Sequence, residues 1–121
     1  MLSDVAAASP RVYLACGNTD LRKSIDGLAA LVSQTYQLDP FAEALFVFCN
    51  RERDKLKILR WQHNGFWLYY RRLERGRFRW PSSAEDAQTL LVEPRQLRWL
   101  LDGLSIEQHR AHRALTARAV I

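Results

Sequence analysis

The sequence is short of the features that mark several large classes of protein. Its two cysteines, Cys16 and Cys49, are too few for a disulfide framework, and no group of cysteine and histidine residues has zinc-ligand spacing. No stretch approaches the ~20 apolar residues of a transmembrane helix, and the first residues lack the pattern of a signal peptide. We therefore expect a cytoplasmic protein with no membrane partner, no metal and no other cofactor.

Lysine is scarce as well, with three lysines against fifteen arginines. Because a planar guanidinium binds phosphate through two hydrogen bonds and also stacks on rings, this bias favours a nucleic-acid partner.

The net charge of +5 is concentrated in one segment. Residues 51–80 hold ten Lys/Arg and three Asp/Glu, a net charge of +7, whereas 1–50 have a net charge of −2 and 81–121 a net charge of 0. The same segment holds seven of the thirteen aromatic residues. Basic and aromatic residues interleaved in this way are typical of surfaces that contact phosphates and stack on bases.

The length of 121 residues predicts one folded domain. We expect a loose leader at 1–10, a single α+β domain at 11–104 and a helical tail at 105–121. Apolar runs indicate strands, apolar residues at helical spacing indicate helices, and Asn64-Gly65 indicates a hairpin turn. In the first half of the chain these patterns predict a strand at 12–16, a helix at 21–38 capped by Thr19 or Asp20, and a buried strand at 44–49. In the second half they predict a hairpin of 55–62 and 66–73, a strand at 77–80, a polar connector at 82–92 and a helix from Pro94 to Gly103. The fold class is α+β: an antiparallel β-meander of about four to five strands, packed with a helix from the N-terminal half and with C-terminal helices.

A turn at Asn64-Gly65 also sets the pairing of the hairpin strands. Lys57 then lies opposite Arg72, while Lys55 lies opposite Glu74 and can pair with it. Two cations directly opposite each other destabilise a sheet unless an anion lies between them or the side chains extend into water. A bound phosphate would relieve this repulsion.

The basic ribbon of residues 51–79 is the predicted DNA-binding element. Arg22 and Lys23 could add an anion site at the start of the first helix. Possible base-stacking residues are Trp67, Tyr69 and Trp80. The predicted DNA contacts are Arg51, Arg53, Lys57, Arg60, Arg71, Arg72, Arg75, Arg77, Arg79, Arg22 and Lys23.

A metal-dependent nuclease is the enzymatic alternative, because such enzymes hold Mg²⁺ with clustered carboxylates. The acidic residues nearest the basic segment, Glu52 and Asp54, are flanked by cations and are expected to balance charge. We predict no catalytic residues and no metal ligands.

Six ordered segments of the chain resemble a known family, the small accessory protein encoded by the second reading frame of insertion sequences of the insertion sequence 66 family (TnpB-type). The resemblance covers about Val12 to Leu104. Its segments are Gly-Asn-Thr-Asp-Leu-Arg-Lys at 17–23 with Asp-Gly-Leu at 26–28, Phe-Val-Phe-Cys-Asn-Arg at 46–51, Lys-Ile-Leu at 57–59 with Trp61, Asn-Gly-Phe-Trp-Leu at 64–68, Arg-Leu-Glu-Arg-Gly-Arg-Phe at 72–78 with Trp-Pro at 80–81, and Gln-Leu at 96–97 before Leu-Leu-Asp-Gly at 100–103.

The resemblance implies a non-catalytic role in DNA transposition, beside a separate transposase that cuts and joins DNA. Two interpretations of the basic ribbon stay open. It binds the DNA ends of the element, or it binds an acidic surface of the transposase and the protein acts in assembly without contacting DNA. Apolar residues on both faces of the hairpin would also suit a homodimer.

Overall fold

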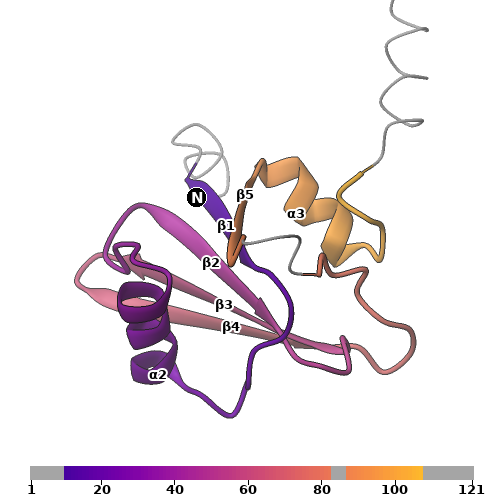
Figure 1. Cartoon of the computed structure of the whole chain (residues 1–121), viewed down its shortest axis with the longest axis horizontal. Helices are drawn as coiled ribbons and strands as arrows, with labels where there is room; N and C mark the ends of the chain where they lie inside the picture. The colour runs from indigo at the N-terminus through magenta and orange to yellow at the C-terminus, as the bar shows by residue number, and fades with distance from the viewer. Residues whose placement is uncertain (1–9, 83–86, 108–121) are drawn as a thin grey trace, which may run out of the picture.

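The computed structural model describes residues 10–82 and 87–107. The expected leader before Pro10 and the expected tail after Glu107 lie outside these ranges. In chain order the elements are β1 (Arg11–Ala15), α2 (Ile25–Ala30), the π-helical turn η1 (Leu31–Thr35), β2 (Ala44–Cys49), β3 (Lys55–Gln62), β4 (Gly65–Arg72), β5 (Thr89–Val92) and α3 (Pro94–Leu101) (Figure 1).

The described strands form one sheet in the order β4-β3-β2-β1-β5. β1 runs parallel to β2, and the remaining pairs are antiparallel. The α+β class is confirmed, but the sheet is mixed rather than a simple antiparallel meander. A parallel pair needs a crossover connection, and α2 with η1 supplies it between β1 and β2.

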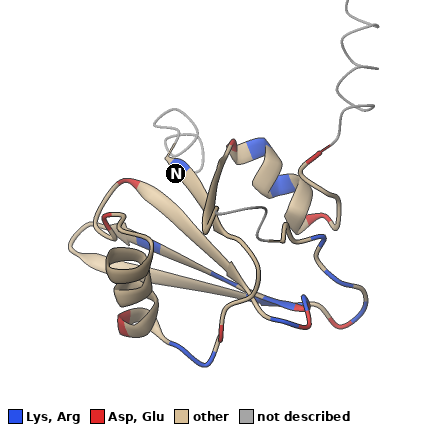
Figure 2. Ribbon diagram, viewed as in Figure 1, with Lys and Arg blue, Asp and Glu red and all other residues tan. Residues whose placement is uncertain are grey.

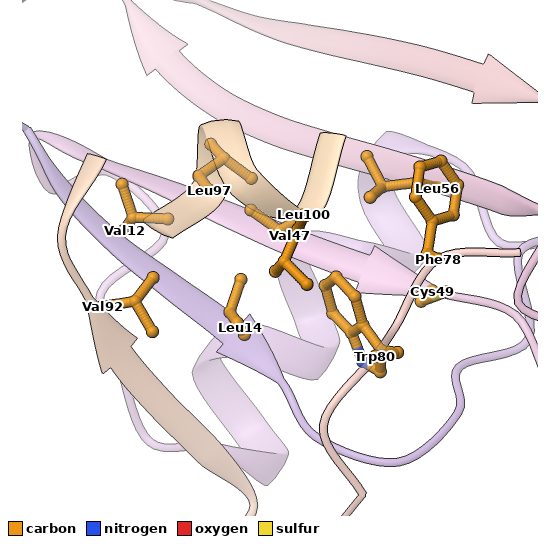
Figure 3. Close-up of a cluster of buried hydrophobic side chains, with 10 residues drawn as sticks. All are labelled: Val12, Leu14, Val47, Cys49, Leu56, Phe78, Trp80, Val92, Leu97 and Leu100. Atoms are coloured by element: carbon orange, nitrogen blue, oxygen red, sulfur yellow. The ribbon is translucent and has the colours of Figure 1, made fainter. Parts of the chain in front are cut away.

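The sheet has a hydrophobic core on each face. Leu28 of α2 and Val32 of η1 pack with Phe46, Phe48 and Leu59 on one face. The other face carries Val12, Val47 and Leu56 among its buried residues, and it is covered by Leu97 and Leu100 of α3 and by Phe78 and Trp80 of the loop that follows β4 (Figure 3). Because α3 lies beside β1 and β5, it does not cover this face of the distant strand β4 (Figure 1).

The predicted start of the first helix is wrong for a local reason. The first helix begins at Ile25 after Ser24, and neither Thr19 nor Asp20 caps it. Asp20 instead accepts hydrogen bonds from the backbone and guanidinium of Arg22, which stabilises a turn ahead of the helix. The predicted helix from Pro94 is confirmed, and Gly103, with a φ of 85°, follows its end.

Two segments differ from prediction because of contacts remote in sequence. Residues 77–80 form no strand, and Phe78 and Trp80 instead turn into the core. Residues 89–92, expected in a polar connector, form β5 because they pair with β1.

The hairpin is confirmed, but its register differs by two residues. His63 and Asn64, with φ angles of 52° and 66°, make the turn, and Gly65 begins β4. Lys57 therefore lies opposite Tyr70 and not Arg72, while Lys55 lies opposite Arg72 and not Glu74. A shift of two residues leaves every side chain on its predicted face, since side chains alternate with period two.

Candidate nucleic-acid interface

The turn between β2 and β3 is organised by the side chain of Asn50, which is 8% exposed. Its Oδ1 accepts hydrogen bonds from the backbone N–H groups of Asp54 and Lys55, and its Nδ2 donates to the carboxylates of Glu52 and Asp54. The bond from Asn50 is the main reason that the pKa of Asp54 is lowered. This network sets the path of the backbone that carries Arg51 and Arg53.

Three hydrogen bonds tie that turn to the loop that follows β4. The N–H of Leu73 donates to the carbonyl of Asp54, and the N–H of Phe78 donates to the carbonyl of Arg53, both at 2.7 Å. The guanidinium of Arg53 donates to the carbonyl of Trp80 at 3.1 Å. Segments 50–54 and 73–80, well separated in the sequence, are therefore held side by side.

Four arginines from these two segments line one hollow of about 670 Å³, which we call the arginine hollow. With Glu52 as the one carboxylate in its lining, four guanidinium groups against one carboxylate give it a net charge of +3. Figure 2 shows Lys and Arg segments gathered in this region, where the strands end and the loop turns back. The lining residues are Arg51, Glu52, Arg53, Arg77, Phe78, Arg79, Trp80 and Ser105.

Among the described residues, none forms an ion pair with Arg51, Arg77 or Arg79, and all three side chains are exposed. Arg75 is also exposed, beside Gly76, whose φ of 78° suits glycine at this turn.

The predicted stacking residues separate into two groups. Trp67 and Tyr69 lie on β4, are 50% and 41% exposed, and have nearly parallel rings with centroids 6.1 Å apart. Trp80 is 3% exposed, and its indole N–H donates to the carbonyl of Ala15 at 2.8 Å. Trp80 is therefore a core residue whose ring is not accessible for base stacking, and the prediction of Trp80 as a stacking residue is wrong.

Other predicted DNA contacts lie apart from the hollow. The ammonium of Lys57 donates to the carbonyls of Leu21 and Lys23, at 2.6 and 3.0 Å, and so ties the loop before α2 to the sheet. Arg72 pairs with Glu74 at 2.8 Å, which raises the pKa of Arg72. Arg60 and Arg71 lie on β3 and β4, on the face that also bears Trp67 and Tyr69.

The two cations expected to form an anion site at the first helix precede that helix, which begins at Ile25. Arg22 and Lys23 lie in the turn before α2, and Arg22 is engaged by Asp20. The hydrogen bonds from Arg22 lower the pKa of Asp20 to about 2.

The acidic residues near the basic segment act as hydrogen-bond and charge partners. Asp54 accepts from Asn50 and lies 3.6 Å from the ammonium of Lys55. Within residues 10–82 and 87–107, no three His, Cys, Asp or Glu side chains are grouped in a way that could hold a metal ion.

The sequence patterns do not single out Asn50 as a functional residue. The one signal is that Asn50 belongs to the segment 46–51, which carries the family resemblance. Its role depends on the path of the turn, since its four hydrogen bonds all go to residues 52–55.

The model of the family described as IS66 Orf2 like protein matches residues 10–111, which include both segments of the arginine hollow. The chain belongs to this family. The resemblance expected from the six segments is confirmed, and membership supports an accessory role in the transposition of an insertion sequence.

Two proteins of Sinorhizobium fredii (strain NBRC 101917 / NGR234) are similar to this IS66 Orf2-like chain. Uncharacterized protein y4hO is 39% identical over 94 residues, which cover 78% of this chain and 80% of that protein. Uncharacterized protein y4jC is 32% identical over 94 residues, covering 78% of this chain and 79% of that protein. No solved structure matches the chain. No helix in the described part is long and apolar enough to cross a membrane.

Proposed function

We propose that this protein is a non-catalytic accessory subunit of transposition that binds DNA at the ends of the element, with the arginine hollow as its phosphate-binding site. The transposase of the same element is its expected protein partner and carries out the cutting and joining.

The observation that carries the proposal is the convergence of four arginines on one hollow of net charge +3. Like charges brought together repel, so such a cluster is stabilised by an anion that binds several guanidinium groups at once. Of these four arginines, Arg53 alone has a side-chain hydrogen bond within the described residues, and it goes to the backbone carbonyl of Trp80. The guanidinium groups of Arg51, Arg77 and Arg79 therefore remain available for the phosphates of a DNA backbone.

Fluorescence anisotropy with a labelled element-end duplex and a scrambled duplex, at roughly 50 and 200 mM salt, tests the proposal. We expect affinity to fall with salt, because each phosphate contact releases counterions. The double variant Arg77→Ala/Arg79→Ala should bind more weakly and reduce the slope of log affinity against log salt by about two. Tighter binding to the end sequence would make the protein a site-recognition subunit.

The matched control is Arg95→Ala/Arg98→Ala on α3. It removes the same charge from residues that do not line the hollow. If both double variants lost the same DNA affinity, the effect would come from net charge alone, and this would contradict the proposed site. A folded wild-type protein that binds neither duplex at low salt would overturn DNA binding. The arginine hollow would then be assigned to an acidic surface of the transposase, the assembly role that is the second interpretation of the sequence.

A further inference from the structure

A strip of exposed side chains on β4 has no role in the proposed phosphate site. Trp67 and Tyr69 are two residues apart on one strand, so they stand on the same face about 6.6–6.8 Å apart along it. Half of Trp67 and 41% of Tyr69 are exposed, although burial of such rings ordinarily contributes strongly to stability. Their faces are nearly parallel, with an angle of 13° between the ring planes.

Two arginines flank the rings on the same face. Arg60 lies directly opposite Trp67 in the strand pairing, and Arg71 is the next residue of β4 on that face after Tyr69. Within the described residues neither arginine has an ion-pair partner. We call these four residues the aromatic strip.

The aromatic strip runs toward the arginine hollow. Arg71 lies opposite Leu56, and Leu56 belongs to the buried cluster that contains Phe78 and Trp80. Phe78 and Trp80 in turn line the hollow. Rings and cations therefore follow one another along this face, from Trp67 to the loop that holds Arg77 and Arg79.

We propose that the aromatic strip binds single-stranded DNA, with unpaired bases stacked on Trp67 and Tyr69 and the phosphates reaching Arg60, Arg71 and the arginine hollow. This inference rests on the proposed function and specifies single-stranded DNA as the ligand. The faces of bases within a duplex are covered by their neighbours, whereas those of a single strand are free to stack on aromatic side chains. The four arginines of the hollow and the two of the strip supply the charge that a DNA strand requires, which favours this occupant over an apolar protein surface.

Anisotropy with the full chain compares a labelled single strand of about 16 nucleotides with the duplex of the same sequence. We expect the single strand to bind at least about tenfold more tightly. Trp67→Ala and Tyr69→Ala should each weaken single-strand binding by about 5- to 100-fold. Tyr70→Ala is the matched control, because Tyr70 is 53% exposed on the same strand but stands on the opposite face. Its effect should stay within about twofold.

Tryptophan emission gives a second measurement that does not depend on the stability of an alanine variant. Saturating single strand should quench part of the emission of the wild type, and Trp67→Phe should lose that quenching while keeping most of the affinity, because phenylalanine still offers a ring.

The inference would be overturned if duplex and single strand bound equally well and neither Trp67→Ala nor Tyr69→Ala had an effect. The proposed phosphate site would still stand in that case, provided that Arg77→Ala/Arg79→Ala weakened binding. A loss for Tyr70→Ala as large as that for Tyr69→Ala would also overturn it. Absence of binding to both DNA forms would contradict the proposed function itself and leave the aromatic strip to a protein partner.

Discussion

At the scale of single residues, the side chain of Asn50 organises the turn between β2 and β3. Its buried amide satisfies two backbone N–H groups and binds two carboxylates, so four polar groups of the turn depend on one side chain. An apolar replacement would leave the N–H groups without this acceptor. Asn50 touches no proposed ligand, and we regard it as a positioning residue for Arg51 and Arg53.

Asn50→Ala should lower the free energy of unfolding by about 1–3 kcal/mol in urea denaturation. It should also raise the pKa of Asp54 toward its ordinary value, because the hydrogen bond from Asn50 is the largest cause of the lowering. An NMR titration of the Asp54 carboxyl measures that change, which a loss of packing alone would not produce. Asn18→Ala, at an exposed position, is the control. An unchanged Asp54 pKa would remove Asn50 from this role.

At the scale of elements, the turn of the hairpin shows how two registers can satisfy one sequence pattern. Both candidate turns are two residues long, and both put Leu59 and Leu68 on the same face. The structure makes the turn from His63 and Asn64, two residue types that tolerate the left-handed region better than most. This register brings the rings of Trp61 and Phe66 to 5.0 Å and the Lys57 ammonium to 6.0 Å from the Tyr70 ring.

Substitutions at the turn distinguish the two registers. Asn64→Ala should lower the free energy of unfolding by about 1 kcal/mol, because alanine resists a φ of 66°. Gly65→Ala should change it by less than about 0.5 kcal/mol, since Gly65 lies in a strand and an added Cβ would meet no atom within 4 Å. Urea denaturation of both variants makes the comparison. If Gly65→Ala were the more damaging, the turn would lie at residues 64 and 65.

The elements that the sequence predicted best are those whose pattern is local. The apolar run of β2 and the proline and glycine around α3 determine those elements without reference to distant residues. β5 and the course of residues 77–80 could not be predicted in this way, because a partner strand remote in sequence decides the first and burial of Phe78 and Trp80 decides the second.

For the candidate site, composition identified the basic and aromatic segment but not the surroundings of each residue. Trp67 and Trp80 are equivalent in a sequence pattern, yet one is half exposed and the other is buried with its indole N–H bonded to Ala15. Likewise, nothing local shows that Lys57 reaches the carbonyls of Leu21 and Lys23.

At the scale of the whole molecule, the positive charge is concentrated in one segment of the chain. The net charge of +7 in residues 51–80 exceeds the +5 of the whole chain. A molecule with arginines held together is stabilised by any ligand that binds them in the folded state and not in the unfolded state.

Pyrophosphate, a small mimic of adjacent phosphates, should therefore raise the Tm. At a concentration about five times its Kd, binding adds about 1 kcal/mol to the stability and raises the Tm by about 4 °C. Differential scanning fluorimetry measures the shift. It should disappear in Arg77→Ala/Arg79→Ala and persist in Arg95→Ala/Arg98→Ala. A shift of equal size in all three proteins would reflect a general salt effect and not the arginine hollow.

The position of β1 between β2 and β5 has a consequence for the order of folding. The hairpin of β3 and β4 joins neighbouring residues and can close early, whereas β1 can pair on both of its edges only once β5, the last strand along the described chain, has been made. Burial of Phe78 and Trp80 needs the face that β1, β2 and α3 complete. We therefore expect the aromatic strip to form early, with the hairpin, and the arginine hollow to form late. A nascent chain would then expose the rings of Trp67 and Tyr69 before it could bind a phosphate in the hollow.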